Sequence, residues 1–250
     1  MNLAEQSWTT VRDALAQGRP VAAIIPCGAT EAHGPHLPLN TDVIISEGMA
    51  RRAAALLESR GIGAFVLPPL AYAPAEYAAA AFPGTITIGA NAAKAVLLDI
   101  ARCLQAQGFS CLALANSHFD PANVAMLREA AVEIHALGLP VAFPDFTGRA
   151  LAQTLTSEFI SGACHAGQFE TSLVMADRLD LVDDAARRAL ANNPASLVAA
   201  FAKGAITFAE AGGPDAYFGD PRGATAAEGE QSFQIMAAAL IKAVRDALGR

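Results

Sequence analysis

Residues 21–43 read Val21-Ala22-Ala23-Ile24-Ile25-Pro26-Cys27-Gly28-Ala29-Thr30-Glu31-Ala32-His33-Gly34-Pro35-His36-Leu37-Pro38-Leu39-Asn40-Thr41-Asp42-Val43. The first five residues form an apolar run that predicts a buried strand. From residue 43 to about 59, apolar side chains recur at helical spacing and predict a helix. The polar stretch between them therefore lies in a loop at the carboxyl end of a strand, where open α/β sheets bind ligands.

Strand-like and helix-like segments alternate along the rest of the chain, a pattern typical of a parallel sheet covered by helices. Further strands are expected at 64–67, 111–115 and 140–143, and further helices at 90–107, 121–137 and 224–248. Beyond Gly148 we expect mostly helix, with one glycine-rich interruption at 211–223. The pattern predicts an α/β fold: a single-domain three-layer α/β/α sandwich with a mostly parallel central sheet, spanning residues 1–250.

The composition narrows the classes of partner. The chain is 53% hydrophobic and only 16% charged, and its net charge is −7, so neither nucleic acid nor an anionic membrane is an expected partner. No apolar run reaches the length of a membrane span, the first residues do not resemble a signal peptide, and the four cysteines are scattered. These features predict a cytoplasmic protein with reduced thiols, and the low charge favours a homo-oligomer.

Two loops carry the residue types that hold divalent transition metals. Glu31, His33 and Asp42 lie in the first loop. The second loop, Asn116-Ser117-His118-Phe119-Asp120, also follows an apolar strand and adds His118 and Asp120. Five mixed oxygen and nitrogen donors are too many for one open tetrahedral zinc and suit two ions bridged by a carboxylate. We expect Asp42 to be the bridge, held at the N-cap of the next helix, and the ions to be Zn, Mn or Fe.

A third segment, Cys164-His165-Ala166-Gly167-Gln168-Phe169-Glu170-Thr171-Ser172, adds two candidates. His165 is a candidate general acid or base, and Glu170 is a candidate catalytic residue that acts as a metal ligand or supports one. The alternative is an ordinary transition from loop to helix, with Glu170 placed to favour the helix N-terminus. From the sequence, either Asp120 or Glu170 could complete the second metal site.

These motifs together resemble the creatininase (creatinine amidohydrolase) family. The resemblance rests on residues 26–42, on Phe82-Pro83-Gly84-Thr85, on Asn116-Ser117-His118, on residues 165–172 and on residues 219–225. It implies a cytosolic α/β hydrolase with two divalent metal ions per chain, often hexameric, that cleaves amide-type C–N bonds in small or cyclic molecules. It also implies that Glu31 and His118 bind one ion and His33 the other, with Asp42 between them.

At several other positions near these motifs, the residue in this sequence differs from the residue in creatininase. Asp120 stands where creatininase carries a glutamate that completes the second site, and His165 matches a histidine beside the substrate that handles protons. Cys164 stands where creatininase has an acid, and the only tryptophan is Trp8, so the tryptophan that gates the creatininase pocket is missing. The resemblance therefore implies conserved metal chemistry on a substrate other than creatinine.

We expect a dinuclear amidohydrolase in which a hydroxide bridging the metals attacks an amide or lactam carbonyl and His165 protonates the leaving nitrogen. Candidate substrate contacts are Glu76, Tyr77, Phe119 and the backbone at Gly167. A deformylase or a ring-opening lactamase could use the same centre. A non-catalytic relative that binds a small molecule or a metal is the alternative from another class, favoured by the altered loop at 72–77 and by Pro144.

Overall fold

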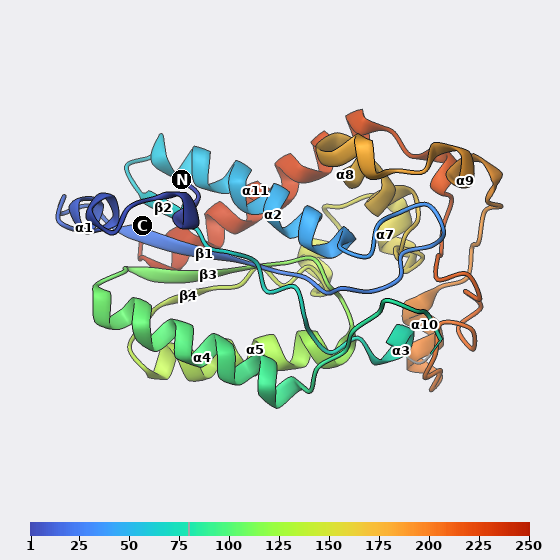
Figure 1. Cartoon of the computed structure of the whole chain (residues 1–250), viewed down its shortest axis with the longest axis horizontal. Coiled ribbons are helices and arrows are strands. Elements are labelled where there is room, and N and C mark those ends of the chain that lie inside the picture. Colours follow the sequence, from blue (N-terminus) through green and yellow to red (C-terminus); the bar gives the residue numbers. More distant parts are fainter. Residues whose placement is uncertain (80) are drawn as a thin grey trace.

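A sheet of four parallel strands runs through the middle of the protein (Figure 1). The structure is a computed structural model that describes residues 1–79 and 81–250. The strands are β1 (Val21–Cys27), β2 (Gly63–Val66), β3 (Cys111–Asn116) and β4 (Val141–Ala142), in the order β2-β1-β3-β4. Every residue of β1, β2 and β3 is buried. Strands covered on both faces need apolar side chains on both, which explains the continuous apolar runs in the sequence.

Helices cover both faces of the sheet (Figure 1). One face carries α2 (Thr41–Glu58), α8 (Gln168–Arg178) and α11 (Ala226–Ala247), and the other carries α4 (Ala90–Gln107) and α5 (Pro121–Ala136). Shorter helices are α1 (Trp8–Leu15), α3 (Glu76–Ala79), α6 (Arg149–Ala152), α7 (Ser157–Ser161), α9 (Asp184–Ala189) and α10 (Leu197–Ala202), with 3-10 turns at Leu3–Glu5, Leu179–Leu181 and Pro221–Gly223. This arrangement confirms the predicted α/β/α sandwich with a parallel sheet.

The core has two halves, one on each face of the sheet. Successive side chains of a strand point to opposite faces, so neighbours in β1 belong to different halves. Ile24 packs in the cluster that contains Phe233, whereas Ile25 packs in the cluster that contains Leu97 and Leu127. The two clusters clamp β1 from both sides and fix the position of the loop that follows it.

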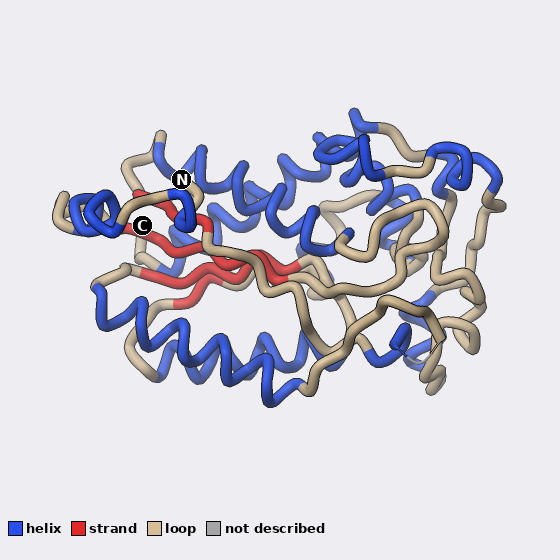
Figure 2. Tube along the Cα trace, viewed as in Figure 1, coloured by secondary structure: helices blue, strands red, loops and turns tan. Residues whose placement is uncertain are grey.

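The chain beyond residue 148 is mostly helical, as predicted, but it has more interruptions than the one expected at 211–223. Apart from α8 and α11, its helices are short and are joined by irregular segments (Figure 2). The breaks fall at Asn192-Asn193-Pro194 and at Gly212-Gly213-Pro214, which favour turns over helix. None of the helices in the described ranges is both long and apolar enough to cross a membrane.

Candidate metal centre

The site forms where β1 and β3 end side by side. Cys27 pairs with Asn116 in the sheet, so the loops after the two strands begin next to each other. The chain runs from β1 outward to β2 and later returns to β3 on the other side of β1, which makes this edge a topological switch point. A Cβ on Gly28 would lie 2.7 Å from the backbone nitrogen of Val43. Only glycine therefore lets the loop pass so close to the start of α2.

Asp42 lies between two groups of potential ligands. Its Oδ2 is 3.1 Å from His118 Nδ1, and its Oδ1 is 3.3 Å from His33 Nε2. Glu31 Oε1 lies 3.2 Å from His118 Nδ1, while Glu170 Oε2 lies 3.6 Å from His33 Nε2. In each triad, Glu31–Asp42–His118 and His33–Asp42–Glu170, the ligand atoms lie within 4.8 Å of one another. Both triads share Asp42.

Asp42 reaches this position from within α2. The N-cap of α2 is Asn40, and Asp42 belongs to the first helical turn, so the prediction that Asp42 is itself the N-cap was wrong. Its backbone is nevertheless fixed, because the Ser117 hydroxyl donates to the Asp42 carbonyl at 2.6 Å. The second strand-end loop thereby holds the start of α2 directly.

Each of the three clustered imidazoles is oriented by a main-chain carbonyl. The Nε2–H of His118 donates to Pro74 O at 2.7 Å, and the Nδ1–H of His33 donates to Glu31 O at 3.1 Å. His165 donates from Nε2 to Ala32 O at 2.9 Å. Because a carbonyl can only accept, the opposite nitrogen of each neutral ring keeps its lone pair for the cluster, as in metal-binding histidines.

The donor set fits a pair of divalent cations. His33 Nε2 and Asp42 Oδ2 are buried and have no hydrogen-bond partner among the described residues. Leaving buried polar atoms unpaired is costly unless another group, such as a cation, satisfies them. Mixed carboxylate and imidazole donors suit Zn, Mn or Fe.

The electrostatics of the metal-free cluster show how strongly it attracts positive charge. Burial alone would lower the pKa of His33, but the carboxylates of Asp42, Glu170 and Glu31 together raise it to about 10. Burial likewise opposes protonation of His118, yet Glu31 and Asp42 hold its pKa well above the usual value. The pKa of Glu170 is raised to about 8, chiefly by burial. Without cations, the site holds protons in their place.

The two acids left open by the sequence lie in different places. Glu170 sits in the first turn of α8, where its Oε2 accepts the Ala166 N–H at 2.7 Å and faces His33. Asp120 caps α5, with Oδ1 accepting the Ala122 N–H at 2.7 Å. Asp120 belongs to none of the potential ligand groups found in residues 1–79 and 81–250. The geometry therefore favours Glu170 as the acid beside His33.

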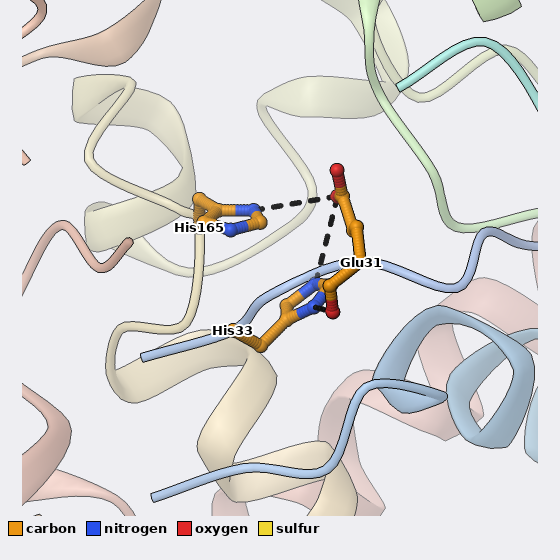
Figure 3. A group of neighbouring side chains, drawn as sticks. All are labelled: Glu31, His33 and His165. Atoms are coloured by element: carbon orange, nitrogen blue, oxygen red, sulfur yellow. Dashed lines mark hydrogen bonds and ion pairs between the residues drawn. The ribbon is translucent and has the colours of Figure 1, made fainter. Parts of the chain in front are cut away.

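His165 lies against the cluster from a third direction. Figure 3 shows its ring and that of His33 both facing the Glu31 carboxylate, with His165 Nδ1 3.9 Å from Glu31 Oε1. The rings of His33 and His165 are 4.3 Å apart. Burial, reinforced by the charge of His33, lowers the pKa of His165 to about 4. His165 is thus a neutral imidazole with a free lone pair, as a proton acceptor requires.

The cluster opens into a cavity of about 330 Å³. Tyr77 and Phe119, both predicted substrate contacts, line this cavity. Glu76 is exposed and Gly167 is the N-cap of α8, and neither belongs to the lining, so their substrate contacts stay predictions. The wall also includes Leu197, Val198, Phe201 and Phe208, which the sequence did not single out. They come from α10 and the segment after it, where no motif marks them.

Glu158, on α7, is a supporting residue that sequence reasoning missed. Its Oε1 accepts the Phe169 N–H and its Oε2 accepts the Asp220 N–H, both at 2.8 Å. A Cβ on Gly167 or Gly219 would lie within 2.4 Å of this carboxylate. The carboxylate therefore fits only because both positions lack a side chain. It ties the segment that bears His165 and Glu170 to the segment at 218–220. A lone glutamate in a short helix carries no signal of this role.

Comparison with known proteins agrees with this geometry. A family model described as "Creatininase: Creatinine amidohydrolase" matches residues 4–244. A "Mycofactocin precursor peptide peptidase" from Mycobacterium ulcerans (strain Agy99) is 33% identical over 219 residues, which cover 85% of this chain and 80% of that protein. A "Creatinine amidohydrolase" from Pseudomonas putida is 31% identical over 194 residues, 72% of each chain.

Solved structures of creatininases share the fold over nearly the whole chain. One described as "Creatininase Mn" has a TM-score of 0.77 at 25% identity and covers 99% of this chain and 98% of its own. A mutant creatininase described as "Zn-Zn type" has a TM-score of 0.75 at 25% identity, with the same coverage. Sequence and fold agree over nearly the whole chain, and the chain belongs to the creatininase family of hydrolases.

Proposed function

We propose that this protein is a dinuclear metal-dependent amidohydrolase that cleaves a C–N amide bond in a small or cyclic substrate other than creatinine. Glu31, Asp42 and His118 would hold one ion, and His33, Asp42 and Glu170 the other. When bound, the two ions would supply an activated water and polarise the substrate carbonyl. The observation that carries the proposal is the position of Asp42, whose two oxygens face different imidazoles.

The protein's own residues supply the rest of the chemistry. His165, neutral and fixed through Nε2, offers Nδ1 to take a proton from the attacking water and pass it to the leaving nitrogen. Glu31 Oε1 lies near both His118 Nδ1 and His165 Nδ1, so its carboxylate fixes the positions of the two rings relative to each other. The buried setting strengthens every charge interaction at the carbonyl, because little water remains to screen it.

Hydrolysis of a peptide is a second candidate of the same reaction type. The relative named as a peptidase matches at slightly higher identity and over more of the chain than the relative named as a creatinine amidohydrolase. The cavity also reaches the surface, since the exposed side chains of Arg128 and Val198 line it. A deformylase or lactamase would use the same centre, and a screen of amide classes distinguishes these substrates.

The test begins with metal content. We expect close to two divalent ions per chain by mass spectrometry, and loss of both ions and of amide hydrolysis in Asp42→Ala. Asp180→Ala is the matched control, because Asp180 pairs with Arg178 at the surface. Turnover that survives exhaustive chelation would contradict the mechanism. Tight binding of amides without turnover, in metal-replete protein, would favour the non-catalytic alternative.

A further inference from the structure

One side of the cavity next to the metal centre is lined by residues that are not candidate metal ligands. Five apolar or aromatic residues from α3, from α10 and from the segment after α10 line this side: Tyr77, Leu197, Val198, Phe201 and Phe208. The rings of Tyr77 and Phe201 lie 3.9 Å apart, and the ring of Phe208 lies 4.5 Å from that of His165. This aromatic wall begins beside the proton-transfer histidine and continues toward the surface. The part of a substrate attached to the scissile amide would lie against it.

The volume of the cavity exceeds the needs of an unsubstituted amide. At about 330 Å³ it lies at the lower end of the range for pockets that hold whole small molecules, which is about 300–1,000 Å³. An amide group occupies only the end near the cluster. The aromatic wall then faces either water or an apolar group of the substrate, and the second arrangement is favoured by the hydrophobic effect.

The charges around the cavity disfavour an anionic substrate group. Apart from the proposed ligands and His165, the charged residues that line it are Asp120 and Arg128. The Arg128 guanidinium is already held by the Asp145 carboxylate, with Nε at 2.8 Å, and by the Thr147 hydroxyl at 3.0 Å. In the described part of the lining, the cationic side chain outside the metal centre is thus already paired with a carboxylate, while Asp120 would repel an incoming one.

We propose that the substrate is an amide with an apolar, non-anionic substituent, of the size of an aromatic ring or a branched aliphatic group. This inference rests on the proposed function. Tyr77, Phe201 and Phe208 contact the substituent, while the metal centre and His165 act on the amide carbonyl and nitrogen. Val198, at the mouth of the cavity, is 63% exposed and limits which groups enter.

Three hydroxamic acids test this preference, because each presents the same metal-chelating group with a different tail. The ligands are acetohydroxamic acid, 3-phenylpropionohydroxamic acid and succinic monohydroxamic acid, titrated into zinc-loaded protein by calorimetry. We expect the phenyl tail to lower Kd by about 10- to 100-fold relative to acetohydroxamic acid, from burial of one aromatic group. The carboxylate tail is expected to give no gain.

Variants locate the gain on the wall. Phe201→Ala should remove about tenfold of the advantage of the phenyl tail and leave acetohydroxamic acid unaffected. Val198→Lys changes an exposed position and should reverse the order by favouring the succinic ligand. Val132→Lys is the matched control, since Val132 is 71% exposed on α5 and does not line the cavity.

The outcomes separate the two levels of the proposal. Equal affinity for all three ligands, or tightest binding of the succinic ligand, would overturn the inference while the metal centre stands. A phenyl gain that is unchanged in Phe201→Ala and Val198→Lys would place the tail elsewhere and also overturn it. Failure of acetohydroxamic acid to bind zinc-loaded protein would refute the proposed function itself, and the inference with it.

Discussion

The floor and the outer wall of the cavity are built in different ways. The floor comes from loops at the ends of β1 and β3 and from the first turns of α2 and α8, and its side chains are buried. The wall comes from α3, α10 and the segment through Phe208, which form a small hydrophobic cluster separate from the two halves of the main core. The floor is therefore clamped by the sheet, whereas the wall is supported mainly by its own side chains.

This difference separates the chemistry from substrate selection. Ligands for metal ions must stay within tenths of an ångström of their positions, which a sheet edge under two core layers provides. A wall of short helices can change its side chains without disturbing those positions, because loops and their neighbours tolerate variation. Relatives of this chain are named for creatinine hydrolysis and for peptide hydrolysis, and such a division allows substrates to differ in this way.

The largest effect should come from changing the floor. Glu170→Gln keeps the shape of the side chain but removes the charge that faces His33, so we expect one ion to be lost and hydrolysis to fall by about 1000-fold or more. Asp120→Asn should keep both ions, because the Asp120 carboxylate caps α5 instead. Metal analysis of both variants checks this. Loss of an ion in Asp120→Asn and not in Glu170→Gln would exchange their roles.

Glu158 supports the floor by holding the segment that carries Glu170, and its removal should give an intermediate effect. Glu158→Ala leaves the N–H groups of Phe169 and Asp220 without their acceptor, which costs about 1–3 kcal/mol of folding stability. Because the same segment carries Glu170, we also expect metal affinity at one site to fall by about 10- to 100-fold.

Two variants distinguish positioning by Glu158 from a general loss of stability. Glu158→Gln keeps one acceptor oxygen and should fall between Glu158→Ala and the wild type in metal titrations. Glu129→Ala removes an exposed partner of Lys94 and should leave metal affinity unchanged. If Glu158→Ala lowered the melting temperature while both sites kept their affinity, its role would be structural only.

The contrast between floor and wall also explains what the sequence could predict. Glu31, His33, Asp42 and His118 were predictable as neighbours, because parallel strands end at one edge and both loops follow apolar runs. The choice of Glu170 over Asp120 was not, since it depends on how α8 turns its first residues toward His33. Phe201 and Phe208 were hidden altogether, because an aromatic residue in a short helix or in an irregular segment has the same sequence pattern in a wall as in a core.

Metal binding should release protons, a smaller effect that is specific to the floor. In the metal-free protein the pKa of His33 is about 10 and that of His118 is raised, so both rings are protonated at pH 7. Each must lose its proton to bind an ion, and affinity should therefore rise by about tenfold per pH unit for each proton released between pH 6 and 9. Calorimetry in buffers of different ionisation enthalpy measures this release. Heats that do not depend on the buffer would contradict it.

The smallest effect should appear in the wall and should depend on the ligand. α10 has only six residues, and Val198 and Phe201 are not fully buried, so its amides should exchange hydrogen faster than those of β1 and β3. Zinc should slow exchange in the loops at 28–33 and 116–120 and leave α10 unchanged. Adding 3-phenylpropionohydroxamic acid should then slow α10 by several-fold, because the tail packs on it, whereas acetohydroxamic acid should not. If zinc alone protected α10 as strongly as the loops, the wall and the floor would be one cooperative unit, and the separation between chemistry and selection would not hold.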